Sequence, residues 1–265
     1  MSSKNRPLTH IHNAAAWDHQ ALQQQEWSRP VSSELVSAAK QGQWDIHITK
    51  KSLPETWLPK NIQNKDILCL ASAGGQQAPI LVAAGARVTV FDISEKQLEQ
   101  DKLVADRDNL SLKTVQGDMS DLSIFQDNSF DFIIHPISNL YVSDLKPVWN
   151  ECHRVLRTNG VLLASFYNPV LFVFARDKEL EAKGLLEPKY TLPYSDTQQL
   201  SPKIIEEKMK RQEALVFGHT LEEQINDQIE AGFLIAGFYE DEHPSPRFLI
   251  EKFMKTMIAT KAIKY

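Results

Sequence analysis

The run from residue 66 to residue 92 constrains the fold more than any other part of this 265-residue sequence. It opens with DILCL, a short apolar run typical of a buried parallel strand. The run breaks at residues 71–75, where no side chain is larger than a hydroxymethyl group. A helix is expected to open near Gln76 and to end at Gly85, and residues 87–91 predict a second strand. The sequence therefore predicts a strand, a tight turn, a helix and another strand in succession.

The second strand ends on Asp92, about 20 residues beyond the turn, which is the spacing of a ribose-binding acid. Small residues in the turn let backbone N–H groups approach a ligand, and an acid at the next strand end can accept hydrogen bonds from two sugar hydroxyl groups. The alternative is an ordinary tight turn followed by a surface aspartate. The pattern indicates half of a nucleotide-binding site.

Composition limits the partners and the compartment. The net charge is −5 and no block of five like charges occurs, so nucleic acid is not an expected partner. The two cysteines, Cys69 and Cys152, suit a reducing cytosol and exclude a disulfide framework or a cysteine-built zinc site. No apolar run approaches the ~20 residues that span a bilayer, and residues 1–5 lack a signal-peptide core. We expect a soluble cytoplasmic protein without membrane contact, and the sequence allows a homodimer.

Residues 1–60 differ from the rest because they hold most of the tryptophans and few aliphatic residues. Asn13 is expected to cap one helix, and Ser32 or Ser33 a second that ends at Gly42. The segment cannot form a core alone, so it must pack on the main fold. Two roles stay open, a helical arm that covers a sheet edge or a lid that borders a ligand. The tryptophans concerned are Trp17, Trp27, Trp44 and Trp57.

Further strands are expected at residues 111–116, 130–134 and 161–166. Asp118 follows the first of these and His135 follows the second. In an open parallel sheet, ligands bind outside the carboxyl ends of the strands. We therefore expect Asp92, Asp118 and His135 to share one rim of the sheet.

Five motifs, taken in order, resemble the class I S-adenosylmethionine-dependent methyltransferases of the broad type 11 small-molecule group. They are the strand and turn at residues 66–75, DIS at 92–94, QGDM at 116–119, FDFII at 130–134 and HRVLRTNG at 153–160. The resemblance covers roughly residues 62–166, with a return over residues 220–264. It implies an α/β Rossmann-like methyltransferase fold, in which a mostly parallel seven-stranded sheet carries helices on both faces and ends in an antiparallel edge pair. Residues 1–60 would form the arm or lid and residues 61–265 the methyltransferase domain, with a cap inserted at residues 168–218 after the fifth strand.

The first motif departs from the family pattern, acid-x-Gly-x-Gly-x-Gly. Cys69 stands where the family has the acid, Ala71 and Ala73 replace the first two glycines, and Gly75 is kept. Alanine takes a positive φ less freely than glycine does. The departure therefore bears on the geometry around the methionine end of the cofactor.

The resemblance implies S-adenosylmethionine as the cofactor. Asp92 would bind the ribose diol, Ile93 would flank the adenine, and Asp118 with Met119 would hold the adenine edge. Gln97 would either reach the ribose face or close a capping box at the start of its own helix. The full set expected to contact the cofactor is Ala71, Ser72, Ala73, Gly74, Gly75, Gln76, Gln77, Asp92, Ile93, Gln97, Gly117, Asp118, Met119 and His135.

The implied activity is methyl transfer to an unidentified small molecule, which requires the enzyme to align a nucleophile and, where needed, to take a proton. No metal site is expected. A non-catalytic S-adenosylmethionine-binding sensor or partner-binding module stays open, whereas a nicotinamide dehydrogenase would need a Gly-x-Gly-x-x-Gly motif that residues 71–76 lack. For each histidine candidate the alternative is a hydrogen-bonded structural role. The candidates for substrate contact or base catalysis are His135, Tyr141, Tyr194 and His219.

Overall fold

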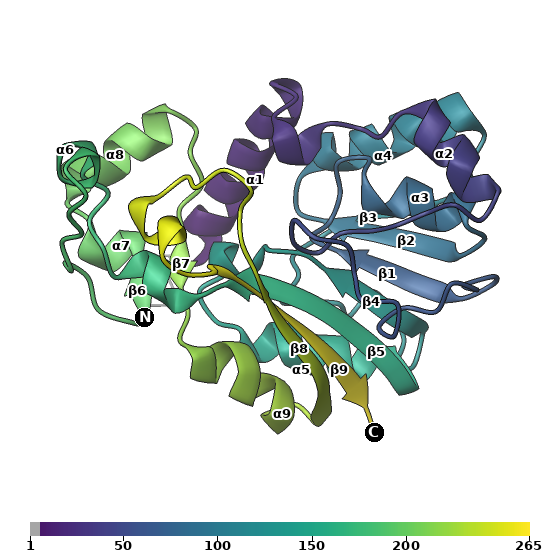
Figure 1. The fold of residues 1–265 in the computed structure, drawn as a ribbon. Helices are drawn as coiled ribbons and strands as arrows, with labels where there is room; N and C mark the ends of the chain where they lie inside the picture. Colours follow the sequence, from purple (N-terminus) through teal and green to yellow (C-terminus); the bar gives the residue numbers. More distant parts are fainter. Residues whose placement is uncertain (1–5) are drawn as a thin grey trace.

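A computed structural model describes residues 6–265, and a seven-stranded sheet organises them (Figure 1). The strand order is β3-β2-β1-β4-β5-β9-β8. The first five strands in this order are parallel, while β9 runs antiparallel to both β5 and β8. This is the expected sheet, including its antiparallel edge pair. The strands are β1 (Asp66–Leu70), β2 (Arg87–Asp92), β3 (Lys113–Gln116), β4 (Phe130–His135), β5 (Leu156–Tyr167), β8 (Phe233–Asp241) and β9 (Met257–Lys264).

Helices cover both faces of the sheet, as Figure 1 shows. One face carries α2 (Ser33–Lys40), α3 (Gln77–Ala83) and α4 (Glu95–Asp108), and the other carries α5 (Lys146–Val155) and α9 (Asp227–Glu230). Alternate residues of a strand point to opposite faces. Ile67 and Cys69 of β1 therefore pack in the cluster beneath α3 and α4, whereas Leu68 and Leu70 pack with Trp149 of α5.

The junction between α5 and β5 lies earlier than the sequence predicts. The strand was expected to begin at residue 161, after the Asn159-Gly160 pair that is typical of a turn, but α5 ends at Val155 and β5 begins at the next residue. The register between β4 and β5 shifts here, because Phe130 pairs with Leu156 and Phe132 pairs with Val161. A bulge in β5 thus takes up the residues that the sequence assigns to a turn.

The N-terminal arm contains α1 (Arg6–Leu22), the 3-10 turn η1 (Glu26–Ser28) and α2. Asn13 lies inside α1, so its predicted role as a helix cap is wrong. Ser32 caps α2 as expected by accepting a hydrogen bond from the backbone N–H of Leu35. The arm also supplies buried core residues, among them Ile46 and Trp57.

The cap at residues 168–218 projects beyond one end of the sheet (Figure 1). Its two short strands pair antiparallel. A capping box follows it, because Thr220 and Glu223 exchange side-chain to backbone hydrogen bonds. The cap elements are η3 (Pro169–Phe172), α6 (Lys178–Ala182), β6 (Tyr194–Ser195), α7 (Asp196–Gln199), α8 (Pro202–Lys210) and β7 (Phe217–Gly218). The remaining turns are η2 (Asn139–Tyr141), the π-helical η4 (Glu222–Asn226) and η5 (Leu249–Lys252).

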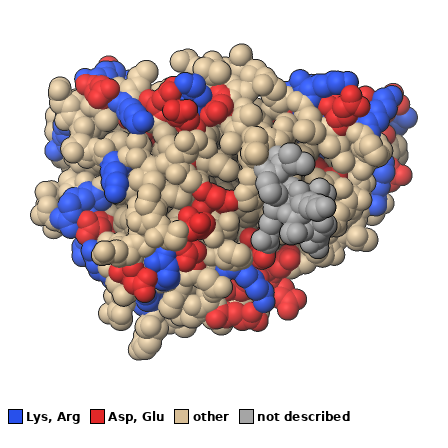
Figure 2. All heavy atoms as spheres, turned by 180° about the vertical axis from the view of Figure 1, so that it is seen from behind, with Lys and Arg blue, Asp and Glu red and all other residues tan. Residues whose placement is uncertain are grey.

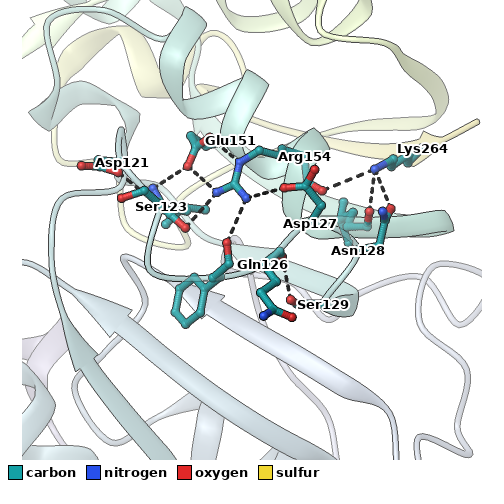
Figure 3. A network of polar contacts seen from close by, with 12 residues as sticks. Asp121, Ser123, Gln126, Asp127, Asn128, Ser129, Glu151, Arg154 and Lys264 are labelled. Atoms are coloured by element: carbon teal, nitrogen blue, oxygen red, sulfur yellow. Dashed lines mark hydrogen bonds and ion pairs between the residues drawn. The ribbon is translucent and has the colours of Figure 1, made fainter.

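Arg154, near the end of α5, anchors the segment between β3 and β4 (Figure 3). All five guanidinium N–H groups find acceptors. These are both carboxylate oxygens of Glu151, Oδ1 of Asp127, and the carbonyl oxygens of Leu122 and Phe125. Lys264 of β9 extends the network to the side chain of Asn128. These contacts therefore fix the segment that follows Asp118.

The surface carries charges of both signs. On the face shown in Figure 2, Lys and Arg side chains are interspersed with Asp and Glu side chains. Within residues 6–265, no helix combines the length and the apolar composition needed to cross a bilayer.

Candidate cofactor and substrate site

A cavity of about 910 Å³ opens at the carboxyl ends of the parallel strands. The ends of β1, β2 and β3 meet there, as expected for neighbouring parallel strands. All but three of the residues predicted to contact the cofactor line this cavity, the exceptions being Gly74, Gly75 and His135. The lining residues from that prediction are Ala71, Ser72, Ala73, Gln76, Gln77, Asp92, Ile93, Gln97, Gly117, Asp118 and Met119.

The turn after β1 has an unusual backbone. Ala71, which replaces a family glycine, has a φ of +46°, and Gly74 and Gly75 have φ values of +115° and +73°. An L-residue in the left-handed region costs roughly 1–2 kcal/mol. Ala73, the other replacement, does not adopt a positive φ. Of the two alanines that replace family glycines, only Ala71 therefore adopts a strained backbone conformation.

Two carboxylates bind the N–H groups of this turn. Asp92 accepts a hydrogen bond from the N–H of Ala73 at 3.3 Å and another from the N–H of Ser94 at 3.0 Å. Asp101 of α4 accepts one from the N–H of Gly74 at 2.9 Å. Burial raises the pKa of Asp92 to about 6 and that of Asp101 to about 7, against the lowering effect of these hydrogen bonds.

Asp101 was not among the site residues predicted from the sequence. It is fully buried and lies behind the turn rather than in the cavity wall. A signal was present, because Gln97, Asp101 and Ala105 fall at helical spacing with apolar Leu98 and Val104. An acid on the buried face of a helix needs a polar partner.

Buried oxygen atoms without partners surround the same turn. Among the described residues these are Ser72 Oγ, Gln97 Oε1 and Asp101 Oδ1. Ser72 and Gln97 also line the cavity. Buried polar atoms are normally satisfied, so these two oxygens are poised to accept hydrogen bonds from a ligand.

Gln97 does not close the predicted capping box. Ser94 caps α4 by accepting from the N–H of Gln97 at 3.1 Å, but the N–H of Ser94 donates to Asp92. The side-chain amide of Gln97 instead donates to Ser28 Oγ and to the carbonyl of Trp17. Gln97 therefore links the arm to the cavity wall.

The arm binds the turn after β1 directly. The N–H of Val31 donates to the carbonyl of Gly75 at 2.9 Å. The side-chain amide of Gln76 donates to the carbonyls of Glu26 at 2.9 Å and Arg29 at 3.2 Å. Residues 26–31 are thereby fixed over the small-residue turn.

Helix α1 binds the other two strand ends. Asp18 accepts hydrogen bonds from Ser94 Oγ at 2.6 Å and from the N–H of Lys96 at 3.0 Å. His10 Nδ1 lies 2.5 Å from Asp118 Oδ2. Although burial opposes ionisation of Asp118, hydrogen bonds from His10 and from Ser120 lower its pKa. The arm thus contacts all three loops that form the rim.

Three of the four catalytic candidates lie outside the cavity wall, and each already has hydrogen-bond partners. Nδ1 of His135 lies 3.0 Å from the carbonyl oxygen of Leu70, and its Nε2 lies 2.7 Å from Asn139 Oδ1. His219 Nε2 bonds the carbonyls of Asn139 and Val142, and the hydroxyl of Tyr194 donates to Asp196 at 2.7 Å. The structure gives these side chains structural contacts and does not support them as substrate contacts.

Tyr141 is the candidate that does line the cavity. Its ring packs edge-to-face on Trp17, with 5.2 Å between the ring centroids. Burial raises the pKa of Tyr141 above its usual range. The side chain is therefore a neutral phenol that can donate or accept a hydrogen bond.

The same wall contains residues that no sequence motif indicated. Tyr167 and Met257 come from β5 and β9, and Ile48 and Lys50 come from the segment after α2. The ammonium of Lys50 lies 3.9 Å from the ring centroid of Trp27 and also bonds Glu26. Tertiary packing brings these residues to the cavity, so local patterns could not identify them.

Comparison with known proteins identifies the family. A methyltransferase domain model matches residues 68–164. Along nearly the whole chain, the sequence is 47% identical over 254 residues to a protein of Bacillus subtilis named uncharacterized methyltransferase YbaJ, covering 96% of this chain and 97% of that protein. The chain belongs to the class I S-adenosylmethionine-dependent methyltransferases. This methyltransferase also matches a sterol 24-C-methyltransferase of Gibberella zeae, at 35% identity over 36% of this chain and 25% of that protein.

Solved structures agree on the fold. An S-adenosylmethionine dependent methyltransferase from Mesorhizobium loti is 18% identical, with a TM-score of 0.58 over 79% of this chain and 95% of that one. A protein from Listeria monocytogenes is 19% identical, with a TM-score of 0.59 over 80% of this chain and 95% of that one. The family assignment removes the nicotinamide dehydrogenase hypothesis.

Proposed function

We propose that this methyltransferase transfers a methyl group to a small, partly apolar molecule held in the cavity beneath the N-terminal arm. The volume and the lining of the cavity support this proposal. Its volume of about 910 Å³ lies near the upper end of the ~300–1,000 Å³ range of small-molecule sites. Aromatic side chains from the arm, from η2 and from β5 stand beside the strand-end loops, namely Trp17, Trp27, Trp44, Tyr141 and Tyr167. The cavity is therefore large enough for a cofactor and a second ligand.

The residues of the rim fit S-adenosylmethionine. Ser72 Oγ and Gln97 Oε1 are buried acceptors that need donors, and an α-ammonium group beside the turn would supply them. Asp92 at the end of β2 would hold the ribose hydroxyls, and Asp118 with Met119 would hold the adenine. When bound, the cofactor supplies a methyl group on a positively charged sulfur. The protein's own contribution is to orient both molecules and to exclude water.

The acceptor would lie against Tyr141, Tyr167 and Met257, which form the wall beyond the cofactor loops. Tyr141 would position it through a hydrogen bond from its neutral phenol, because burial disfavours the phenolate. The partial match to a sterol methyltransferase spans only 98 residues, so it does not identify a sterol as the acceptor.

The arm and the cap would act together as the cover of this site. The side-chain amide of Asn13 bonds both peptide groups of Leu215, at 2.9 Å to the N–H and at 3.0 Å to the carbonyl. It also donates to the carbonyl of Tyr141 at 3.3 Å. His12 Nε2 bonds the carbonyl of Glu213 at 2.8 Å. Helix α1, which lies between the cap and the sheet in Figure 1, thus links the cap to the cavity wall.

Two experiments test this function. Incubation with methyl-labelled S-adenosylmethionine and fractionated cell extract should place the label in the small-molecule fraction, and label in RNA or protein would contradict the proposed acceptor class. Addition of S-adenosylhomocysteine should change tryptophan fluorescence and slow proteolysis of residues 21–31. Equal cleavage with and without this ligand would contradict the cover.

A further inference from the structure

We propose that Asp101 is a positioning residue that replaces, from helix α4, the acid that the β1 strand lacks. The inference rests on the proposed cofactor site and adds a residue that the family motif does not contain. Cys69 occupies the position of the strand acid. The N–H of Gly74 in the following turn still donates to a carboxylate, but this carboxylate belongs to α4 rather than to β1.

The geometry of the turn requires such a partner. Gly74 and Gly75 both have positive φ, and their consecutive N–H groups turn away from the cavity toward α4. Asp101 Oδ2 accepts the first of them at 2.9 Å. Without an acceptor, buried N–H groups would be left unpaired, at a cost in free energy. Asp101 therefore fixes the turn that forms the floor of the cavity.

Asp101 and Cys69 occupy neighbouring space. Both are fully buried, and both belong to the side of the sheet that α3 and α4 cover. The negative charge of Asp101 contributes to the raised pKa of the Cys69 thiol, after the larger effect of burial. Asp101 thus places a carboxylate close to Cys69, from a helix rather than from the strand.

The environment of Asp101 makes its charge responsive to pH. The ionisable groups that face it are Asp92 on β2 and Cys69 on β1. Among the described residues, no cation forms an ion pair with it. Burial and the nearby charge of Asp92 raise its pKa to about 7, while the N–H groups of Gly74 and Gly75 lower it. Protonation weakens the hydrogen bond that Asp101 accepts from the N–H of Gly74, so the turn should loosen as the pH falls through 7.

The test is calorimetric titration with S-adenosylhomocysteine at pH 8 and pH 6. Asp101→Asn keeps the shape and removes the charge, and we expect it to weaken binding about tenfold at pH 8. The matched control is Asp106→Asn on the exposed side of α4, which should bind within about twofold of the wild type. Wild-type affinity should fall between pH 8 and pH 6 by more than the affinity of Asp101→Asn, which should retain only the part of the fall that belongs to Asp92.

Relocation of the acid gives a further test. Adding Cys69→Asp to Asp101→Asn returns a carboxylate to the strand, and affinity should recover to within about threefold of the wild type. Should Asp101→Asn fail to fold, Asp101→Glu, which keeps the charge but displaces it by one methylene, should bind about tenfold more weakly. Wild-type affinity and pH profile in the Asn variant, or in the Glu variant where that one is used, would overturn the role of Asp101. A wild-type protein that binds no S-adenosylhomocysteine would instead overturn the cofactor site.

Discussion

The network around Arg154 and the turn after β1 satisfy their carboxylates in opposite ways. Glu151 has both oxygens bonded by one guanidinium at 2.7 Å, and this contact lowers its pKa. Asp101 is more deeply buried, meets only backbone N–H groups, and keeps one oxygen without a partner. The first arrangement stabilises the fold, whereas the second holds a destabilised charge beside a binding site. The free-energy cost of burying such a charge persists where the surrounding structure enforces it and the function uses it.

The network around Arg154 should contribute most to stability. Arg154→Ala leaves the partly buried Glu151 without its cation and the carbonyls of Leu122 and Phe125 without a donor, and we expect the free energy of unfolding to fall by about 3 kcal/mol. Urea denaturation measures this change. Arg211→Ala, which removes an exposed arginine paired with Glu213, should change it by less than about 0.5 kcal/mol. A similar loss in both variants would mean that the Arg154 network contributes no more to stability than an exposed ion pair does.

The next prediction concerns the carboxylate that faces the cavity. Asp92→Ala should weaken binding of S-adenosylhomocysteine by roughly 1.5–3 kcal/mol, the range for hydrogen bonds to a charged group. Calorimetry on the folded variant gives the value. Unchanged affinity would sink the assignment of Asp92 to the ribose.

The buried carboxylate of Asp101 should make the stability of the protein depend on pH. An acid whose folded-state pKa is raised costs stability once the unfolded chain ionises, and that cost is complete above the folded pKa. For Asp101 the relevant window runs from its ordinary value of 3.8 to about 7. Asp101→Asn avoids the cost, so its melting temperature relative to the wild type should rise from pH 4 to pH 8. A difference that stays flat over this range would show that Asp101 is not buried as a charge.

The smallest effect concerns the backbone of the turn. Ala71→Gly relieves a positive φ at the expense of unfolded-state entropy, so its stability should lie between the wild-type value and about 1 kcal/mol above it. Ala73→Gly meets no such strain and should lose about 0.5–1 kcal/mol. Thermal unfolding of the two variants side by side checks the sign. A loss in both would indicate that Ala71 is not strained.

Much of the fold could be predicted because a buried parallel strand is a continuous apolar run that can be read locally. Site residues at or just beyond the ends of such strands, including Asp92 and Asp118, were placed on the rim for the same reason. His135 is the last residue of β4, but alternation turns its ring toward Trp149, 6.0 Å away between centroids. The direction of a side chain at a strand end depends on register, which the strand's own sequence does not specify.

Contacts between distant segments were the least predictable. Asparagine often caps helices, but the side-chain amide of Asn13 instead bonds the backbone of Leu215, a residue that no local sequence pattern connects with it. Asp101 and Arg154 likewise acquire their roles from elements packed against them. A polar residue on a buried helix face signals that a partner exists, and the tertiary structure decides which one.

The bond between Asn13 and Leu215 joins residues 202 positions apart. During synthesis, the arm therefore leaves the ribosome long before the segment that completes its hydrogen bonds has been made. Closing so large a loop is slow compared with forming the local βαβ units. The rim of the site can assemble first from the β1 to β5 region, and the hydrogen bonds that join α1 to the cap must wait for Leu215. A nascent chain that ends before Leu215 would have the rim of the site without the link that joins α1 to the cap.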